Sequence, residues 1–145
     1  MLRILTNLNL LNRQDFLATA GLIASGYTGT WVSKIAADYI DLPGTAGDSC
    51  IGTVWTESNR DGTVGWTPDV SDTGKLTVVF GRFRALTDQF TATPAIGEAL
   101  KVGTDGKLAT ATLGGTDRVV GYCTKASHTI EHLGRNHTVI EYVTA

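Results

Sequence analysis

Charged residues are scarce in this chain of 145 residues, and this scarcity narrows its possible functions. Lys, Arg, Asp and Glu make up 18% of the sequence, which is below the roughly 25% typical of soluble domains. The formal net charge is −2, so there is no excess of positive charge to attract nucleic acid or anionic lipid. We therefore expect neither nucleic acid nor a membrane among its partners.

Cysteine is almost absent. Cys50 and Cys123 are the two cysteines of the chain, and neither lies in a C-x-x-C or another metal-binding spacing. This pattern indicates neither a disulfide scaffold nor a zinc framework. Because cysteine is among the residue types most often buried, we expect two buried, reduced thiols. We also expect no cofactor.

No apolar run approaches the roughly 20 residues that a membrane-spanning helix needs. One apolar stretch, Phe16–Ser25, could be mistaken for the core of a secretory signal. Arg13 and Asp15 lie just before it, and Arg3 is the one basic residue near the start of the chain. We therefore expect an unprocessed N-terminus that is held in place by the fold.

β-Branched residues are abundant, with 22 Thr, 11 Val and 8 Ile. Branching at Cβ suits the pleated, half-buried surface of a sheet better than a helix. The 17 glycines and 3 prolines punctuate the chain, which is typical of many short strands joined by turns. The sequence predicts an all-β fold, a small β-sandwich or β-barrel of short antiparallel strands with an extended N-terminal arm and one short helix.

The first 29 residues differ from the rest because apolar and polar residues alternate imperfectly. Asn12 is expected to cap a short helix through Leu17 that stops at Gly21. The apolar segment can either pack on its own domain or reach a partner by strand addition or groove filling, and both alternatives stay open. We assign residues 1–29 to an N-terminal arm or short helix and residues 30–145 to a single β domain.

Five strands are expected in the first part of that domain. They are Thr30–Ile35, Tyr39–Leu42, Cys50–Glu57, Val64–Trp66 and Lys75–Leu86. In the fifth strand the apolar residues change face after Gly81, which indicates a β-bulge there. Arg82 and Arg84 then share a strand face that meets either a carboxylate-bearing partner or solvent.

Residues 95–143 have the most regular pattern of the chain, and we call them the cassette. Two β-runs flank Asp105-Gly106, a dipeptide that favours a hairpin turn. A third run, Val119–Tyr122, carries a central glycine, Gly121, and the last strand is expected at Val139–Val143. Residues 127–136 are expected to form a loop between these two runs.

One enzyme-like motif lies in that expected loop. Residues 128–132 match H-x-x-E-H, in which a helix brings two zinc-binding imidazoles together beside a general base. The segment contains two β-branched residues and is followed by Gly134, so the required helix is not expected. We expect solvated histidines, no metal site at His128, His132 or His137, no catalytic residue and no enzymatic activity.

Aromatic residues support a different hypothesis, a carbohydrate-binding β module. Such a module needs an exposed aromatic platform, for which the candidates are Trp31, Trp55, Trp66 and Tyr122. Half-buried core positions are the alternative, because aromatic residues that alternate with polar ones in strands are usually buried. Trp66, which precedes Thr67-Pro68, is expected to be the most exposed.

The cassette resembles a known family. The residues that carry the likeness are Gly97-Glu98-Ala99-Leu100-Lys101-Val102, Asp105-Gly106-Lys107-Leu108, Val119-Val120-Gly121-Tyr122 and the closing Val139–Val143. In this order they resemble the G-[DE]-x-L-x-V, DGKL, VVG and final-strand pattern of auxiliary capsid proteins of tailed bacteriophages, the decoration or cement proteins. The upstream segments Gly29–Val32 and Gly47–Gly52 are more loosely similar to the opening strands of that family.

This resemblance implies a structural virion protein that binds the outer surface of a phage capsid. It would stabilise the head by bridging subunits of the major capsid protein. The resemblance also implies a homo-oligomer, commonly a trimer in this family, that is made in the bacterial host cytoplasm and located on the virion. The alternatives are another phage component, such as a head-fibre base or tail adaptor, and the carbohydrate-binding β module.

We expect the capsid or protomer interface to include the apolar N-terminal residues and two arginines. These candidates are Leu2, Ile4, Leu8, Leu10, Leu11, Arg82 and Arg84. Deletion of residues 1–12 is then expected to leave a folded protein that no longer decorates heads.

Overall fold

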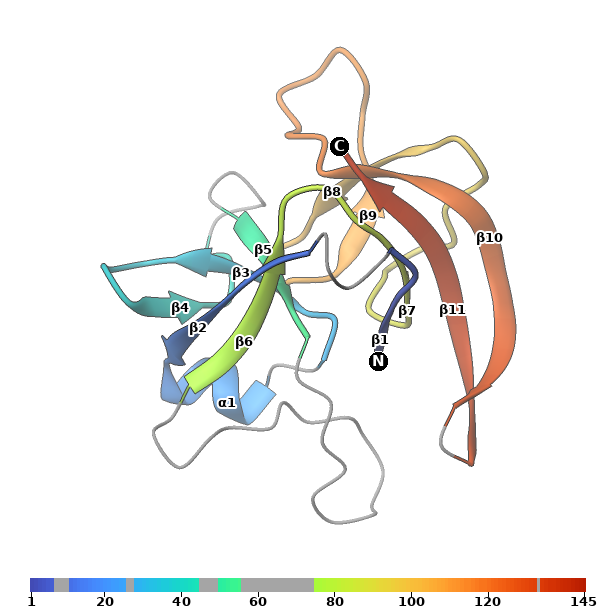
Figure 1. Ribbon diagram of the computed structural model, residues 1–145. Coiled ribbons are helices and arrows are strands. Elements are labelled where there is room, and N and C mark those ends of the chain that lie inside the picture. The colour runs from blue at the N-terminus through green and yellow to red at the C-terminus, as the bar shows by residue number, and fades with distance from the viewer. Residues whose placement is uncertain (7–10, 26–27, 45–49, 56–74, 133) are drawn as a thin grey trace.

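The computed structural model describes residues 1–6, 11–25, 28–44, 50–55, 75–132 and 134–145. Five strands close into a barrel in the order β2-β4-β3-β5-β6, and six form a curled sheet in the order β1-β7-β11-β10-β8-β9. Figure 1 shows the barrel and the curled sheet side by side. The predicted all-β class with one short helix is confirmed. No helix among the described residues is long and apolar enough to cross a membrane.

The barrel is built from short strands and closed by the helix. Its elements are β2 (Asn12–Ala18), α1 (Ala20–Ser25), β3 (Trp31–Lys34), β4 (Tyr39–Asp41), β5 (Cys50–Val54) and β6 (Lys75–Phe80). β2 and β4 run parallel, and the other pairs are antiparallel. α1 lies across one end of the barrel (Figure 1), where Leu22 is fully buried with the interior residues Phe16 and Val78.

The curled sheet is entirely antiparallel. Its strands are β1 (Leu2–Ile4), β7 (Arg84–Thr87), β8 (Ala99–Val102), β9 (Leu108–Thr110), β10 (Gly121–His132) and β11 (Arg135–Thr144). The cassette thus supplies most of this sheet. The loop expected at residues 127–136 is wrong, because β10 continues through it and pairs with β11 from His128 opposite Val139 to His132 opposite Arg135.

One cluster of buried side chains joins the two sheets. Trp31, Cys50 and Val79 enter it from the barrel, and Leu100 and Tyr142 enter it from the curled sheet. Cys123 belongs to the same cluster, and no disulfide joins it to Cys50. The expectation of two buried thiols is confirmed, and burial raises the pKa of the Cys123 thiol.

The first 29 residues are not an arm separate from the domain, because they are divided between the two sheets. β1 pairs with β7, and β2 pairs with β6. The helix expected from Asn12 is wrong. The helix instead follows Thr19, whose hydroxyl accepts a hydrogen bond of 3.2 Å from the Leu22 N–H, as an N-cap residue does.

Met1 is part of the core and is only 1% exposed. Its ammonium group donates to the Thr28 carbonyl oxygen over 2.9 Å and forms an ion pair with Asp88. The other oxygen of Asp88 lies 3.1 Å from Nδ1 of His137. These contacts connect the first residue to β11 and hold the N-terminus in place, as expected.

The expected fifth strand is two strands in different sheets. β6 ends at Phe80, the chain turns at Gly81 with a φ of 82°, and β7 begins at Arg84. The change of apolar face at Gly81 therefore marks a corner between the barrel and the curled sheet, not a bulge. Arg82 lies in this corner, so it does not share a strand with Arg84.

Candidate functional site

Three large apolar side chains are exposed at one end of the curled sheet. Ile96 is 69% exposed, Leu113 is 70% exposed and Tyr122 is 42% exposed. Ile96 and Leu113 line an open hollow that also includes the buried residues Ala99 and Ala111. Tyr122 pairs directly with Ala99 across β10 and β8, so their side chains lie on the same face. We call these five residues the end patch.

Backbone and carboxylate hydrogen bonds fix the turn that carries Ile96. The Glu98 carboxylate accepts from the Ala95 N–H over 2.8 Å and from the Thr110 hydroxyl over 3.3 Å. Gly97, at a φ of 87°, donates its N–H to the Cys123 carbonyl over 2.8 Å. Ile96 is thus held outward by a tight turn.

Leu113 belongs to the loop between β9 and β10, and this loop lies at the top of Figure 1. The Asp117 carboxylate forms hydrogen bonds that hold the two ends of the loop together. It accepts from the Thr112 N–H over 2.9 Å and from Lys101 Nζ over 3.0 and 3.1 Å. The backbone hydrogen bond from Thr112, followed by the contact with Lys101, holds the pKa of Asp117 below its usual value. We call this set of contacts the Asp117 latch.

We expect Asp117→Asn to change the acid stability of the protein. Because the folded pKa of Asp117 is lowered, the latch stabilises the fold fully above the ordinary carboxyl pKa of about 3.9. That stabilisation is lost as the pH falls through the folded pKa. The unfolding temperature of the variant should therefore be a few degrees below that of the wild type near neutral pH. This difference should disappear at acidic pH.

Thermal unfolding of both proteins between neutral and strongly acidic pH measures this difference. Asp15→Asn is the control, since that carboxylate lies on the barrel rather than in the loop. A constant gap between wild type and Asp117→Asn across the whole range would show that the charge of Asp117 does not stabilise the loop.

A second exposed apolar site lies at the end of the β3–β4 hairpin. Ile35 is 57% exposed and Tyr39 is 44% exposed, and the Ile35 N–H donates to the Tyr39 carbonyl over 3.0 Å. We call these two residues the hairpin tip. Figure 1 shows the hairpin projecting from the barrel, far from the β9–β10 loop of the end patch.

The residues expected at a partner interface do not form one surface. Leu2 is fully buried, and Ile4 and Leu11 are partly buried against the same cluster. Arg82 and Arg84 are both exposed, and Arg84 pairs with the Glu141 carboxylate. Leu8 and Leu10 lie outside the described residues, as does the expected strand Val64–Trp66.

The structure identifies exposed apolar residues that the sequence interpretation missed. Ile96 lies between Pro94 and Gly97, and Leu113 directly precedes Gly114-Gly115. A large apolar residue inside a turn sequence cannot easily reach a core, because turns run over the surface. That local contrast is the signal that could have revealed the end patch.

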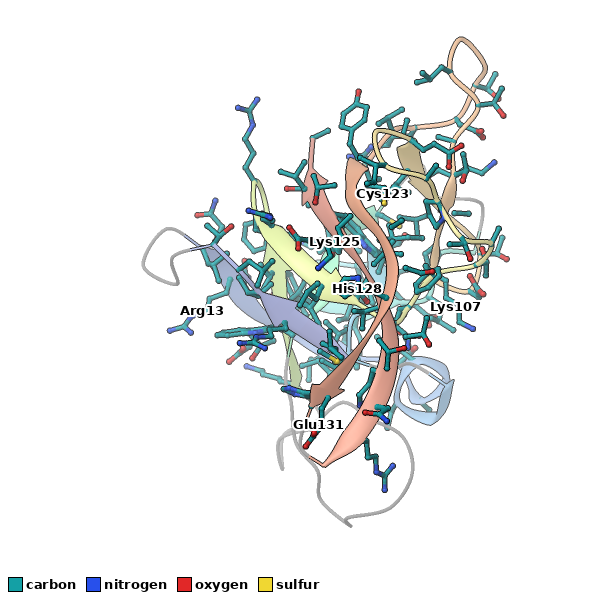
Figure 2. The ribbon with its side chains drawn as sticks, turned by 90° about the vertical axis from the view of Figure 1, so that its right-hand side faces the viewer. Arg13, Lys107, Cys123, Lys125, His128 and Glu131 are labelled. Carbon is teal, nitrogen blue, oxygen red and sulfur yellow. The ribbon has the colours of Figure 1, made fainter. Side chains whose placement is uncertain are left out.

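The H-x-x-E-H motif lies on a strand, where the residues cannot adopt the metal-binding geometry of a helix. Four residues along a strand span roughly 13 Å, so His128 and His132 cannot bind the same ion. Figure 2 shows His128 and Glu131 well separated along β10. Among the residues that the structure describes, no three His, Cys, Asp or Glu side chains gather as metal ligands.

The candidate aromatic residues do not form a common platform. Trp31 is only 6% exposed and belongs to the core, whereas Tyr122 belongs to the end patch. Trp55 is half-buried on the barrel, and Trp66 lies outside the described residues. A carbohydrate site that combines several of these residues is therefore not what their placement suggests.

The end patch and the hairpin tip offer the same kind of chemistry, which is the burial of apolar side chains against a partner. Full burial of a Leu or Ile side chain contributes about 1.5–3 kcal/mol, so each site can supply a modest contact. Comparison of the sequence with models of known families and with curated proteins finds no match.

Proposed function

We propose that this protein is a structural component of a phage virion that binds the outer surface of the capsid and bridges subunits of the major capsid protein. The observation that carries the proposal is the presence of two exposed apolar sites, the end patch and the hairpin tip, at different ends of the molecule. A bridging protein must contact two neighbours at once. Exposed apolar patches are typical of protein interaction sites.

The cassette that resembles the auxiliary capsid proteins supports the same function. Its strands are neighbours in the curled sheet, and all five residues of the end patch lie within residues 95–143. The family-like segment therefore carries the larger exposed apolar site. A trimer above a junction between capsomers is the assembly that we favour.

Modest contacts are sufficient for this function. A protein that binds only the expanded shell stabilises that shell by linkage. Many copies on one lattice act together, so the stabilisation of the particle exceeds that of each contact.

The copy number in purified particles tests the proposal. We expect hundreds of copies per head by quantitative mass spectrometry, and a density on the outer capsid surface by cryo-electron microscopy. About a dozen copies at one vertex would instead indicate a head-fibre base or tail adaptor. Absence from the particle would contradict a virion role altogether.

Variants at the two apolar sites test the bridging geometry. Leu113→Ser and Ile35→Ser should each weaken binding to expanded capsids by roughly 10- to 150-fold. Each variant removes one apolar side chain that is exposed in the free protein and becomes buried when the capsid binds. Co-sedimentation with capsids that lack the protein measures the affinity. Ile23→Ser is the matched control, because Ile23 is 36% exposed on α1 and belongs to neither site.

Full capsid binding by both Leu113→Ser and Ile35→Ser would show that these sites do not contact the shell. The thermal unfolding temperature of each variant should remain near that of the wild type, because both side chains are mostly exposed. A loss of capsid binding is then not caused by misfolding.

A further inference from the structure

A hollow of about 400 Å³ lies on the outer surface of the barrel, away from the two apolar sites. It is lined by Arg13, Gln14, Asp15, Trp55 and Thr77. Asp15 pairs with Thr77 across β2 and β6, and the backbone N–H of Trp55 donates to the backbone carbonyl of Thr77 over 2.9 Å. Three adjacent chain segments therefore place a carboxylate, a hydroxyl and an indole in one row.

The alternation of β6 explains why this row faces outward. Leu76 and Val78 point into the barrel, where both are fully buried. Thr77 lies between them and must point to the other side of the sheet. Val79, two residues further on, has the same direction as Thr77 but is covered by the curled sheet. The hollow lies on the part of the barrel surface that the curled sheet does not cover.

Arg13 and Trp55 form the aromatic side of the hollow. The guanidinium carbon of Arg13 lies 5.4 Å from the centre of the Trp55 ring, which is within the range of a cation–π contact. Figure 2 shows that Arg13 projects outward from β2. The contact positions several N–H donors beside an apolar ring.

The Asp15 carboxylate forms the acceptor side of the hollow. Oδ1 of Asp15 accepts the Thr77 hydroxyl hydrogen over 2.7 Å. The described part of the chain gives Oδ2 of Asp15 no hydrogen bond, so this oxygen can accept one from a ligand. Donors and acceptors therefore remain available around the indole.

We propose that this hollow binds a neutral saccharide. The C–H face of a sugar ring is apolar and packs on an aromatic ring, while its hydroxyls require both donors and acceptors. Trp55 supplies the ring, Arg13 supplies donors and Asp15 supplies an acceptor. Arg13 and Asp15 carry opposite charges, so the hollow favours neither a cationic nor an anionic ligand.

This site is independent of the proposed capsid contacts. None of its residues belongs to the end patch or the hairpin tip. A protein that fails to bind capsids can still bind sugar here, and a capsid-binding protein can lack sugar affinity. The two proposals therefore fail or succeed in separate experiments.

An array of defined neutral and acidic oligosaccharides tests the proposal with the full chain. We expect binding to neutral glycans. Titration with the strongest neutral glycan should show at least tenfold weaker affinity for Asp15→Ala and for Trp55→Ala, because each loses one of the two recognition elements. Tyr122→Ala, which changes an exposed aromatic residue outside the hollow, should bind as the wild type does.

Two conservative variants guard against misfolding. Trp55→Phe keeps an aromatic ring and should retain most of the affinity, whereas Asp15→Asn keeps the shape but lacks the carboxylate and should lose affinity. No binding to any neutral glycan would overturn the proposal. So would binding to acidic glycans alone, or binding that Trp55→Ala and Asp15→Asn leave unchanged.

Discussion

Replacing Gly106 with alanine is expected to destabilise the protein by roughly 3 kcal/mol or more. Gly106 has a φ of 75°, a conformation that disfavours any residue with a Cβ atom. A Cβ at this position would lie 2.5 Å from Cγ2 of Thr30 and 2.5 Å from the carbonyl oxygen of Trp31. The carbonyl oxygen belongs to the barrel backbone, which cannot move away without disturbing β3.

The Gly106 turn also joins the two sheets directly. The Trp31 N–H donates to the Gly106 carbonyl over 2.8 Å. Alanine would therefore push the β8–β9 turn away from the barrel and weaken this hydrogen bond as well. The expected loss lowers the unfolding temperature by roughly 10 °C, since 1 kcal/mol corresponds to about 2–4 °C in a chain of this size.

Gly114→Ala is the matched control for this prediction. Gly114 has a φ of 80°, and a Cβ there meets no atom within 4 Å. This variant should lose only the cost of the left-handed conformation, about 1–2 kcal/mol. Urea unfolding of the three proteins separates conformational strain from steric conflict. Equal losses of unfolding free energy in Gly106→Ala and Gly114→Ala would show that a Cβ at Gly106 does not clash with the barrel.

The sequence predicted this turn but not its contact. Asp105-Gly106 is a local signal for a hairpin, and the hairpin is present between β8 and β9. The contact with Trp31 joins segments far apart in the chain, and no local pattern records such a pairing. The same reason explains why the predicted β class was right while the division of the strands between two sheets was not foreseen.

Two errors have local causes. The pattern at Gly81 shows a change of apolar face, which a bulge and a corner between sheets produce equally. Residues 128–132 resemble a loop in composition because the outer part of the β10–β11 hairpin is only partly buried. A strand with little buried surface has few apolar residues, so its sequence predicts a loop.

The candidate site was only partly visible in the sequence. The sequence placed the family resemblance in the cassette but the expected contacts on the N-terminal residues and two arginines, whereas the end patch lies within the cassette. The N-terminal residues attracted attention because they are apolar, but apolar character alone does not separate an interface from a core. Leu2 and Leu5 illustrate this point, since Leu2 is 0% exposed and Leu5 is 40% exposed.

Leu2→Ala is expected to destabilise the protein by about 2–5 kcal/mol, the usual cost of removing a buried leucine side chain. Leu2 is fully buried in the cluster between the two sheets, and β1 pairs with β7 through it. Leu5→Ala is the matched control and should change stability by about 0.5 kcal/mol or less, because much of its side chain is exposed. Chemical unfolding of both variants measures the difference.

The same burial changes the outcome expected for deletion of residues 1–12. The deletion removes β1, the buried Met1 and Leu2, and the first residue of β2. It exposes the cluster that joins the sheets and opens one edge of β7. We therefore expect a truncated protein that is largely unfolded, seen as loss of the cooperative unfolding transition. A folded truncated protein that still fails to bind capsids would instead restore the N-terminal segment as a contact with the shell.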